Sequence, residues 1–377
     1  MKTTQPTIHI IYSNYIANDG NGMSVGGIQT YLSNLIDLIK SKGLKVLLYQ
    51  TANFDFEKDI DGLKVYAYKI DKGESVPQKL YEKCKAHLGE DDVIIFGTDF
   101  QIIKTDCKRV IGIQHGISWD IPNKKIGNGH FAYLKEFVRK TRNAWQRIKC
   151  IKNADKIVCV DYNFVNWYRA IVPYSQTSFT VIPNFTEIPA EREYEDKTDV
   201  KIIFARRFFT YRGTRLFANV IERIMQKYNN VSVTFAGEGP DEEYINNKFK
   251  NNSKVTITKY NSNESLAIHC RHDIAVVPTI GSEGTSLSLL EAMASGCVAI
   301  CSNVGGMTNI ILDGFNGIMF DPYNEDDLYY AIERVITDKA LRQKLAKNGY
   351  KTVKESFSLD IWKERWSRVI DDTINKK

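Results

Sequence analysis

The chain has 377 residues and a formal net charge of +6 at pH 7. Domains usually contain roughly 100–200 residues, so this length predicts two domains. The hydrophobic and charged fractions, 43% and 25%, are those of a soluble globular protein. No apolar run approaches the roughly 20 residues of a membrane span, which excludes a transmembrane protein. The mild positive charge suits phosphorylated ligands, nucleic acid or an anionic membrane surface.

The N-terminus and the cysteines indicate an intracellular protein. The segment Met1–Pro6 is polar and leads straight into a predicted strand, without the apolar core of a signal peptide. The seven cysteines are an odd number and form no Cys-x-x-Cys pair, which fits reduced thiols better than a disulfide framework. We therefore expect a cytoplasmic protein.

The first half of the chain begins with a pattern typical of a βαβ unit. A buried strand is predicted over Thr7–Ser13, and apolar residues at helical spacing predict a helix over Ile28–Lys42. Gly43 ends this helix, and a second strand follows at Lys45–Gln50. This order is the seed of a parallel sheet. Further strands are predicted at Leu63–Ala67, Val93–Phe96, Arg109–Gln114, Lys156–Val160 and Thr180–Pro183.

A long helix is predicted over Phe131–Asn153, and its pattern has two interpretations. One face is apolar and the rest is strongly cationic, with seven Lys and Arg residues against Glu136 alone within Leu134–Lys152. The first interpretation is a helix packed on the core with a solvated back. The second is docking to anionic lipid headgroups, which would bring a lipid-linked acceptor within reach.

The second half repeats the alternation after a polar stretch, Glu187–Thr198, that is predicted to be a linker. Strands are predicted at Val200–Ala205, Ser232–Ala236, Val255–Thr258, Ile274–Pro278 and Val298–Cys301. Helices are predicted at Leu216–Tyr228, Asp241–Lys250, Ser286–Ser295, Asn324–Val335, Lys339–Glu355 and Leu359–Ile374. The alternation predicts two α/β domains, each with a parallel sheet.

The segment Gly281–Gly296 is the strongest candidate for a ligand site. It follows a predicted strand, and ligands bind beyond the carboxyl ends of parallel strands. Thr285 or Ser286 is positioned to cap the helix, so the amides around Thr285, Ser286 and Leu287 are predicted to form an anion seat. Gly284 permits a close approach of the backbone.

Two carboxylates flank this predicted anion seat. Glu283 lies just ahead of the helix, where it is able to accept hydrogen bonds from sugar hydroxyls. Glu291 lies within the helix and suits a ribose diol, as a carboxylate does in dinucleotide-binding folds. Taken singly, a glutamate on a helix is most often a solvated surface residue. Together with the anion seat, the pair favours a nucleotide sugar.

The run Glu283-Gly-Thr-Ser-Leu-Ser-Leu-Leu-Glu291-Ala-Met-Ala-Ser-Gly resembles the signature of the family 4 glycosyltransferases. Gly305-Gly306 and the segment Asp313–Gly317 are similar to the family's segment after the signature. The resemblance implies a GT-B architecture, with two Rossmann-like parallel-sheet domains facing a central cleft, and transfer with retention at the anomeric carbon. The expected divisions are an acceptor-side domain at 1–187, a donor-binding domain at 188–356, and a C-terminal helix at 357–377 that packs back on the first domain.

Two basic residues also resemble the family's phosphate clamp. Arg206 follows the strand Val200–Ala205, and Arg212 lies six residues later, before Gly213. The resemblance implies that both grip the donor diphosphate. The sequence departs from the family pattern, because Ala205 replaces a glycine and Arg212 a lysine. An arginine keeps the charge but binds phosphate with a different geometry. A solvated basic turn is the structural alternative.

Three residues of the first domain are candidates on similar grounds. Gly26 and Gly27 open a helix after the first strand and look like the family's glycine loop, which touches the donor phosphate or the acceptor. Their spacing is not Gly-x-Gly-x-x-Gly, which counts against a nicotinamide dehydrogenase. His115 follows a predicted strand, where the family places a histidine beside the donor sugar. Each also has a structural alternative, as a helix start or a packed histidine.

The remaining expectations concern the nucleotide base and metals. The strand end at Tyr260 is predicted to help hold the base, which is either uracil or guanine. Asp59-Ile60-Asp61 fits the Asp-x-Asp pattern of other transferases but is interpreted as a polar turn ahead of a strand. Because GT-B enzymes generally work without metals, no metal site and no cofactor besides a UDP- or GDP-linked donor are predicted.

The resemblance thus implies a hexosyltransferase whose acceptor is a glycan or a lipid-linked sugar. The resemblance implies a place in bacterial polysaccharide synthesis, including lipopolysaccharide, capsule or exopolysaccharide, with the protein working at the inner face of the membrane. No nucleic-acid partner is expected. The alternatives are a nucleotide-sugar epimerase of the same two-domain fold and a non-catalytic basic module that binds membranes.

Overall fold

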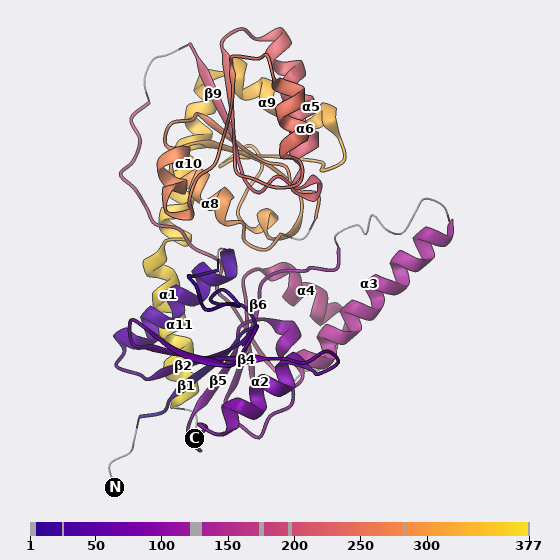
Figure 1. The fold of residues 1–377 in the computed structure, drawn as a ribbon. Helices are drawn as coiled ribbons and strands as arrows, with labels where there is room; N and C mark the ends of the chain where they lie inside the picture. Colours follow the sequence, from indigo (N-terminus) through magenta and orange to yellow (C-terminus); the bar gives the residue numbers. More distant parts are fainter. Residues whose placement is uncertain are drawn as a thin grey trace. The chain divides into compact units, whose positions relative to one another are not determined.

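The computed structural model describes residues 5–24, 26–120, 130–172, 177–194, 198–281 and 283–375 (Figure 1). The chain forms two compact units. Unit 1 comprises Met1–His115, Asn128–Pro183 and Trp362–Lys377, and unit 2 comprises Gly116–Gly127 and Asn184–Ile361. Residues 1–4 of the polar N-terminus and residues 195–197 of the predicted linker lie outside the described residues.

Unit 1 is built on a sheet of eight described strands in the order β3-β4-β2-β1-β5-β6-β7-β8. Their bounds are β1 Ile8–Ile11, β2 Val46–Ala52, β3 Phe56–Ile60, β4 Leu63–Lys69, β5 Val93–Phe96, β6 Val110–Gln114, β7 Lys156–Cys159 and β8 Ser178–Val181. All neighbouring strands pair parallel except β3, which runs antiparallel to β4. The predicted βαβ start of a parallel sheet is therefore confirmed.

Strand β3 was not predicted from the sequence. Its residues are mostly exposed and charged, as is common at the edge of a sheet, so it lacks a hydrophobic pattern. The turn is confined to Asp61 and Gly62, both with positive φ, which is the geometry of a tight hairpin. The prediction of a polar turn through Asp59 is thus wrong, because Asp59 pairs with Lys64 inside the hairpin.

Five helices belong to the described part of unit 1: α1 Gly27–Ser41, α2 Val76–Lys85, α3 His130–Ile151, α4 Tyr162–Ile171 and the larger part of α11 Leu359–Ile374. Helix α11 contributes two buried tryptophans, Trp362 and Trp366, that pack edge-on against Tyr31 of α1. The indole Nε1 of Trp366 donates a hydrogen bond of 2.7 Å to the Tyr31 hydroxyl. The last helix of the chain therefore completes the core of the first unit.

Helix α3 departs from its predicted packing. Of the two interpretations, the helix packed on the core is wrong for most of its length, because none of the described side chains from 131 to 147 is buried. Only Ile148 and Ile151, at the C-terminal end, enter the core. Figure 1 shows the rest of the helix projecting from unit 1. Its apolar residues Phe137, Val138 and Trp145 are more than half exposed.

Unit 2 contains six described strands in the order β11-β10-β9-β12-β13-β14, all parallel. Their bounds are β9 Val200–Ala205, β10 Val231–Ala236, β11 Val255–Thr258, β12 Ile274–Val277, β13 Val298–Ser302 and β14 Ile318–Phe320. The helices are α5 Thr214–Lys227, α6 Glu242–Phe249, α7 Ser265–His269, α8 Leu287–Ala294, α9 Glu325–Thr337 and α10 Lys339–Ser356.

Helices cover both faces of this second sheet. Alternate residues of β13 enter different clusters: Val298 and Ile300 pack with α5 and α9, whereas Ala299 and Cys301 pack with α8. Because both faces are buried, the strands are continuously hydrophobic, as parallel sheets require. The predicted class, two α/β domains with parallel sheets, is confirmed. No helix among the described residues combines the length and the hydropathy needed to cross a membrane.

Candidate active site

The candidate site of unit 2 lies where the strand order reverses. Strand β9 is in the middle of the sheet, with β10 and β11 on one side and β12 and β13 on the other. Arg206 follows β9 directly, and the loop that carries Thr279 and Glu283 follows β12. In open parallel sheets, the loops at such a reversal diverge and leave room for a ligand. The fold therefore brings these side chains together from positions more than 70 residues apart.

Two arginines converge on one carboxylate oxygen of Glu283. Arg206 Nη2 donates to Glu283 Oε2 at 2.7 Å, and Arg212 Nη1 donates to the same oxygen. Thr279 Oγ1 donates to this oxygen at 3.1 Å and accepts a hydrogen bond from Arg206. The structure thus joins three of the predicted catalytic residues in a single polar network.

This network is largely shielded from water. The side chains of Arg206 and Glu283 are 7% and 10% exposed. Burial alone acts to raise the pKa of Glu283, but the charges of Arg206 and Arg212 outweigh it and hold the pKa below its usual value. The cluster has two positive charges and one negative charge, so it keeps an excess of one positive charge. Such a buried excess is a strong attractor for an anion.

A glycine lets Arg212 reach the cluster. Thr210–Arg212 form a 3₁₀ turn that ends at Gly213, whose φ is +82°. A Cβ atom at Gly213 would overlap the carbonyl group of Pro278, at the end of β12. Only glycine combines this backbone conformation with so close an approach. Because the turn packs directly on the β12 loop, the Arg212 side chain meets Glu283.

The loop that precedes α8 is held by its backbone. Gly306 donates its N–H to the carbonyl of Glu283 at 2.8 Å, and Asn184 Nδ2 donates to the carbonyl of Thr285 at 2.6 Å. Ser286, one of the two predicted capping residues, occupies the N-cap position of α8, but its side chain makes no capping hydrogen bond. Its Oγ lies 3.3 Å from that of Ser288 instead. The start of α8 therefore offers amides from Leu287 onward to an anion.

Glu291 occupies a second polar position, within helix α8. Ser265 Oγ, at the start of α7, donates to Glu291 Oε2 at 2.6 Å. Burial raises the pKa of Glu291. The pKa of Tyr260 is raised to about 12, mainly by burial and to a lesser extent by the negative charge of Glu291. Tyr260 packs beside Ile203, Ala205 and the other small residues of this face. The fold therefore places the residues predicted for the ribose and the base next to each other.

A buried histidine fixes α7 and makes stability depend on pH. His269 Nδ1 lies 2.7 Å from the Ser265 carbonyl, and burial lowers the pKa of His269 to about 4. As pH falls below 6.5, the unfolded chain binds a proton that the folded chain rejects, so stability falls. We expect His269→Gln to reduce the loss of unfolding free energy between pH 7 and pH 5 by about 2 kcal/mol.

Urea unfolding at both pH values measures this difference. The control is His87→Gln, because His87 is exposed. Equal pH dependence in wild type and His269→Gln would count against a buried, neutral His269.

Three predicted residues lie in unit 1. His115 follows β6, its Nε2 lies 3.0 Å from the carbonyl oxygen of Gly97, and its ring packs edge-on against Tyr31. Because a carbonyl only accepts, Nε2 carries the hydrogen and Nδ1 is left as an acceptor. Burial lowers the pKa of His115 to about 4, so the ring is neutral near pH 7. Gly26 and Gly27 form the start of α1, which has no side-chain cap.

Sequence reasoning missed Thr279, Ser265 and Asn184, which contact the predicted residues. Thr279 stands just after a predicted strand, and this position was a usable signal. Ser265 and Asn184 carried none, because their partners are 26 and 101 residues away. Among the described residues, no group of three or more His, Cys, Asp or Glu side chains is arranged to hold a metal ion.

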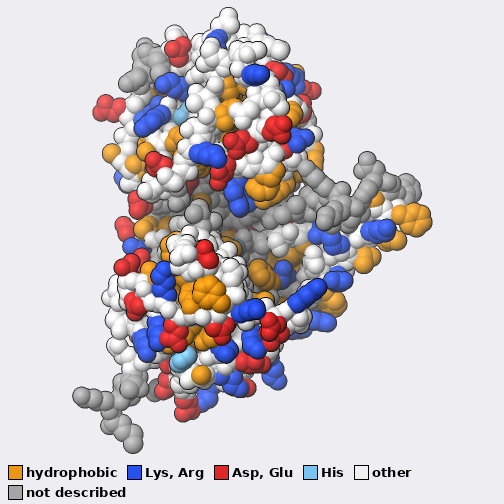
Figure 2. Space-filling view, in the orientation of Figure 1, with side chains coloured by type: hydrophobic (Ala, Val, Ile, Leu, Met, Phe, Trp, Pro, Cys, Tyr) orange, Lys and Arg blue, Asp and Glu red, His pale blue; other side chains and the backbone are white. Residues whose placement is uncertain are grey.

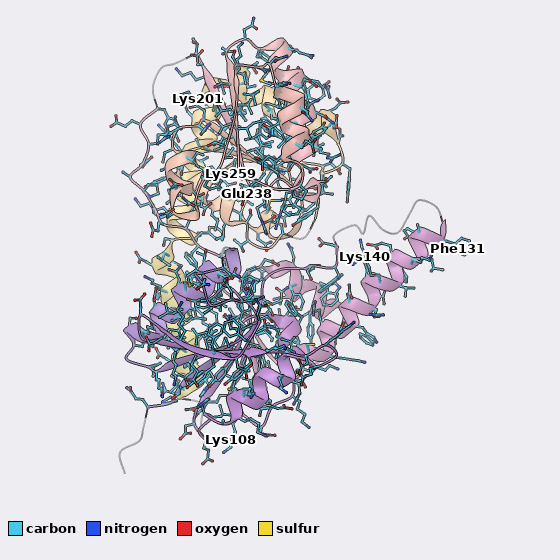
Figure 3. The ribbon with its side chains drawn as sticks, viewed as in Figure 1. Lys108, Phe131, Lys140, Lys201, Glu238 and Lys259 are labelled. Carbon is cyan, nitrogen blue, oxygen red and sulfur yellow. The ribbon has the colours of Figure 1, made fainter. Side chains whose placement is uncertain are left out.

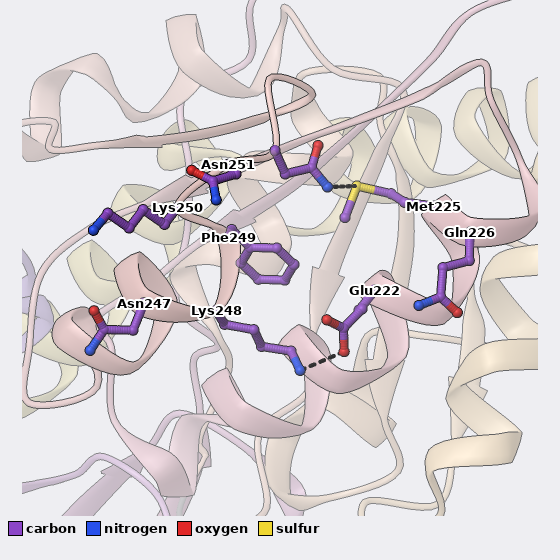
Figure 4. Close-up of a pocket in the computed structure, with 9 residues that line it drawn as sticks. Glu222, Met225, Gln226, Asn247, Lys248, Phe249, Lys250 and Asn251 are labelled. Atoms are coloured by element: carbon purple, nitrogen blue, oxygen red, sulfur yellow. Dashed lines mark hydrogen bonds and ion pairs between the residues drawn. The ribbon is translucent and has the colours of Figure 1, made fainter.

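A separate surface pocket lies between α5 and α6 (Figure 4). Its lining consists mainly of amide and lysine side chains, and its carboxylate, Glu222, is paired with Lys248 at 2.6 Å. None of the predicted site residues lines it. The chemistry of unit 2 is therefore concentrated at the strand ends rather than in this pocket.

Comparison with known sequences supports a transferase. Residues 186–352, which contain the whole Arg206–Glu291 region, match the family model described as "Glycosyl transferases group 1". The chain is 24% identical to the uncharacterized glycosyltransferase MJ1178 of Methanocaldococcus jannaschii over 95% of this chain and 94% of that protein. Several other curated relatives align over less than half of their own length.

A further relative is named for its activity. The chain is 23% identical to the UDP-Gal:alpha-D-GlcNAc-diphosphoundecaprenol alpha-1,3-galactosyltransferase of Escherichia coli, over 71% of this chain and 70% of that protein. Among solved structures, Anabaena Alr3699/HepE in complex with UDP and glucose is similar with a TM-score of 0.70 and 14% identity, covering 97% of this chain and 99% of that one.

The fold is the GT-B fold of glycosyltransferases. In GT-B terms, unit 2 presents the carboxyl ends of a Rossmann-like sheet, with the arginines and Glu283 at its reversal point. Unit 1 presents the start of α1 and His115 at the corresponding edge of its own sheet. Each half thus carries its polar groups where this fold binds ligands.

Proposed function

We propose that this chain is a retaining glycosyltransferase that moves a sugar from a nucleoside-diphosphate donor to a glycan or lipid-linked acceptor. The observation that supports this most is the convergence of Arg206 and Arg212 on Glu283 at the strand reversal of unit 2. Two guanidinium groups in the same unit as the N-terminus of α8 match a diphosphate in charge and geometry. An epimerase of the same fold would convert the donor without an acceptor, and a membrane-binding module would not require Arg206, Arg212 or Glu283.

The same contacts imply an exchange of ligands during binding. Without a donor, Glu283 Oε2 occupies the position where both arginines would hold a phosphate oxygen. A diphosphate carries more negative charge than one carboxylate, so it competes for the arginines and releases Glu283. The released carboxylate is then able to accept hydrogen bonds from the hydroxyls of the donor sugar. Binding and sugar recognition are thereby coupled through one side chain.

Charge stabilisation of the leaving group is the proposed source of rate enhancement. As the bond between the anomeric carbon and the phosphate oxygen breaks, negative charge grows on the diphosphate, and Arg206, Arg212 and the amides at the start of α8 stabilise it. The acceptor oxygen attacks from the same face and its proton passes to the departing phosphate. We favour this route over a covalent intermediate because the released Glu283 is assigned to the hydroxyls of the donor sugar, and the sequence offers no obvious second carboxylate as a nucleophile.

The other predicted residues complete the proposal. Glu291, with Ser265 behind it, is assigned to the ribose hydroxyls, and Tyr260 to the base. Neutral His115 is assigned to a sugar hydroxyl, because its Nδ1 is able to accept a hydrogen bond from the hydroxyl group. A glycan or lipid-linked acceptor, polysaccharide synthesis and work at the inner face of a membrane are proposed by analogy with the galactosyltransferase relative.

A panel of nucleotides tests the donor proposal. UDP, GDP, UDP-glucose, UDP-galactose and GDP-mannose are added separately, and we expect one base to raise the melting temperature while the other leaves it unchanged. A ligand concentration of 100 times Kd corresponds to about 2.7 kcal/mol of stabilisation.

A transfer assay follows with the donor that this panel selects. Incubated with glycolipids from a cell extract in the presence of EDTA, this donor should yield a glycosylated product without added metal. No shift with any nucleotide, or conversion of the donor without an acceptor, would contradict transfer.

A further inference from the structure

The projecting part of α3 carries an apolar stripe that the rest of unit 1 leaves uncovered. Phe131, Leu134, Val138 and Trp145 are each at least 55% exposed. Their spacings of three, four and seven residues place them along one side of a helix. Single exposed hydrophobic residues are ordinary, but a stripe of four large ones on one helix face marks a binding surface.

Basic residues border the same stripe. Lys135, Arg142 and Lys149 are exposed and recur every seven residues, so they form a row alongside the apolar residues. Figure 2 shows Lys and Arg side chains next to hydrophobic ones along this projection, and Figure 3 places Phe131 at its far end. The acidic Glu136 is neutralised by Arg139 at 2.8 Å. Within the part of the chain that the structure describes, the surface therefore combines exposed apolar groups with basic side chains that no acidic group pairs.

The position of α3 in the unit adds a structural argument. Its base is anchored, because Ile148 and Ile151 are buried and Arg147 lies over the Phe100 ring and 3.7 Å from Asp99. The preceding four turns have no buried side chain. Helices in water obtain most of their stability from packing an apolar face, so this segment is built for a surface that lies outside unit 1.

We propose that α3 is a docking element for an anionic lipid bilayer. Lying along the surface, the stripe enters the boundary between headgroups and acyl chains while the row of basic residues contacts lipid phosphates. The charge favours lipid over a second copy of this chain, since two α3 surfaces would repel each other. This inference extends the proposed function, because it accounts for access to a lipid-linked acceptor, but it does not depend on the identity of the donor.

Flotation with lipid vesicles tests the proposal on the full chain without any nucleotide. We expect binding to phosphatidylcholine vesicles that contain 30% phosphatidylglycerol and weak binding to phosphatidylcholine alone. Leu134→Ser with Val138→Ser, and separately Arg142→Glu with Lys149→Glu, should each lower binding at least tenfold. The control, Lys344→Glu with Lys347→Glu, makes the same charge change on exposed positions of α10 and should bind as wild type.

The fluorescence of Trp145 provides a second measurement, which shows whether the helix enters the bilayer. Brominated lipids should quench part of the tryptophan fluorescence of the wild type, and this quenching should be lost in Trp145→Tyr. Melting temperatures within a few degrees of wild type establish that the variants fold. Absence of binding to anionic vesicles would overturn the proposal, as would dimerisation through α3 or a stripe variant that weakens nucleotide binding in solution. Nucleotide thermal shifts, measured separately, distinguish this failure from failure of the proposed transfer.

Discussion

Replacing Glu283 with glutamine should change binding and catalysis in opposite directions. The amide cannot neutralise Arg206 and Arg212, which then remain buried with two uncompensated charges. A nucleoside diphosphate no longer has to displace a carboxylate, so we expect its affinity to rise about tenfold, or roughly 1.4 kcal/mol. Loss of the carboxylate that orients the donor sugar should lower kcat by on the order of 100-fold.

Isothermal titration calorimetry with the diphosphate and initial-rate kinetics with the sugar donor measure the two effects. The matched control is Glu238→Gln, which removes an exposed carboxylate paired with Lys259 at 2.8 Å, a pair labelled in Figure 3. Two outcomes would contradict the exchange of ligands: weaker diphosphate binding in Glu283→Gln, or wild-type turnover. The variant should also unfold more easily without ligand, because unpaired buried charges are destabilising.

Replacing Arg206 with alanine should give the largest loss of donor binding. This guanidinium group is 7% exposed and contacts both Glu283 and Thr279, so little water is available to substitute for it. Truncating one member of a buried, hydrogen-bonded charge pair typically costs several kcal/mol. We therefore expect the Kd of the nucleoside diphosphate to increase about 100-fold, with a further loss in kcat because leaving-group charge is stabilised less.

Arg207 provides an exacting control for this change. It is the next residue in the chain, but its side chain is exposed and lies over the ring of Phe209. Arg207→Ala should bind the diphosphate as wild type does. If the two alanine variants lose affinity equally, the effect comes from net charge and the specific site is disproved. A double variant, Arg206→Ala with Glu283→Gln, should deviate from additivity because the two residues are in contact.

The sequence predicted much of the fold, because buried parallel strands leave continuous apolar runs. The ranges Val93–Phe96 and Val255–Thr258 coincide with β5 and β11. Where such runs were missing, the predictions failed. Strand β3 is polar because it lies at an edge, and the short helices α2 and α4 left no recognised pattern between predicted strands. In α3, helical periodicity was recognised correctly, but periodicity does not distinguish an apolar face that enters a core from one that remains exposed.

The candidate site shows the same division. The positions of Arg206, Glu283 and Glu291 relative to strand ends followed from the sequence, since the alternation of strands and helices is a local property. The order of strands in the sheet makes β9 and β12 neighbours. This order also brings the two arginines to one carboxylate oxygen. Strand order results from packing among segments far apart in the chain, for which hydropathy provides no measure. The sequence by itself therefore determined which residues stand at the carboxyl edge of the sheet, and only the tertiary structure decided which of them touch.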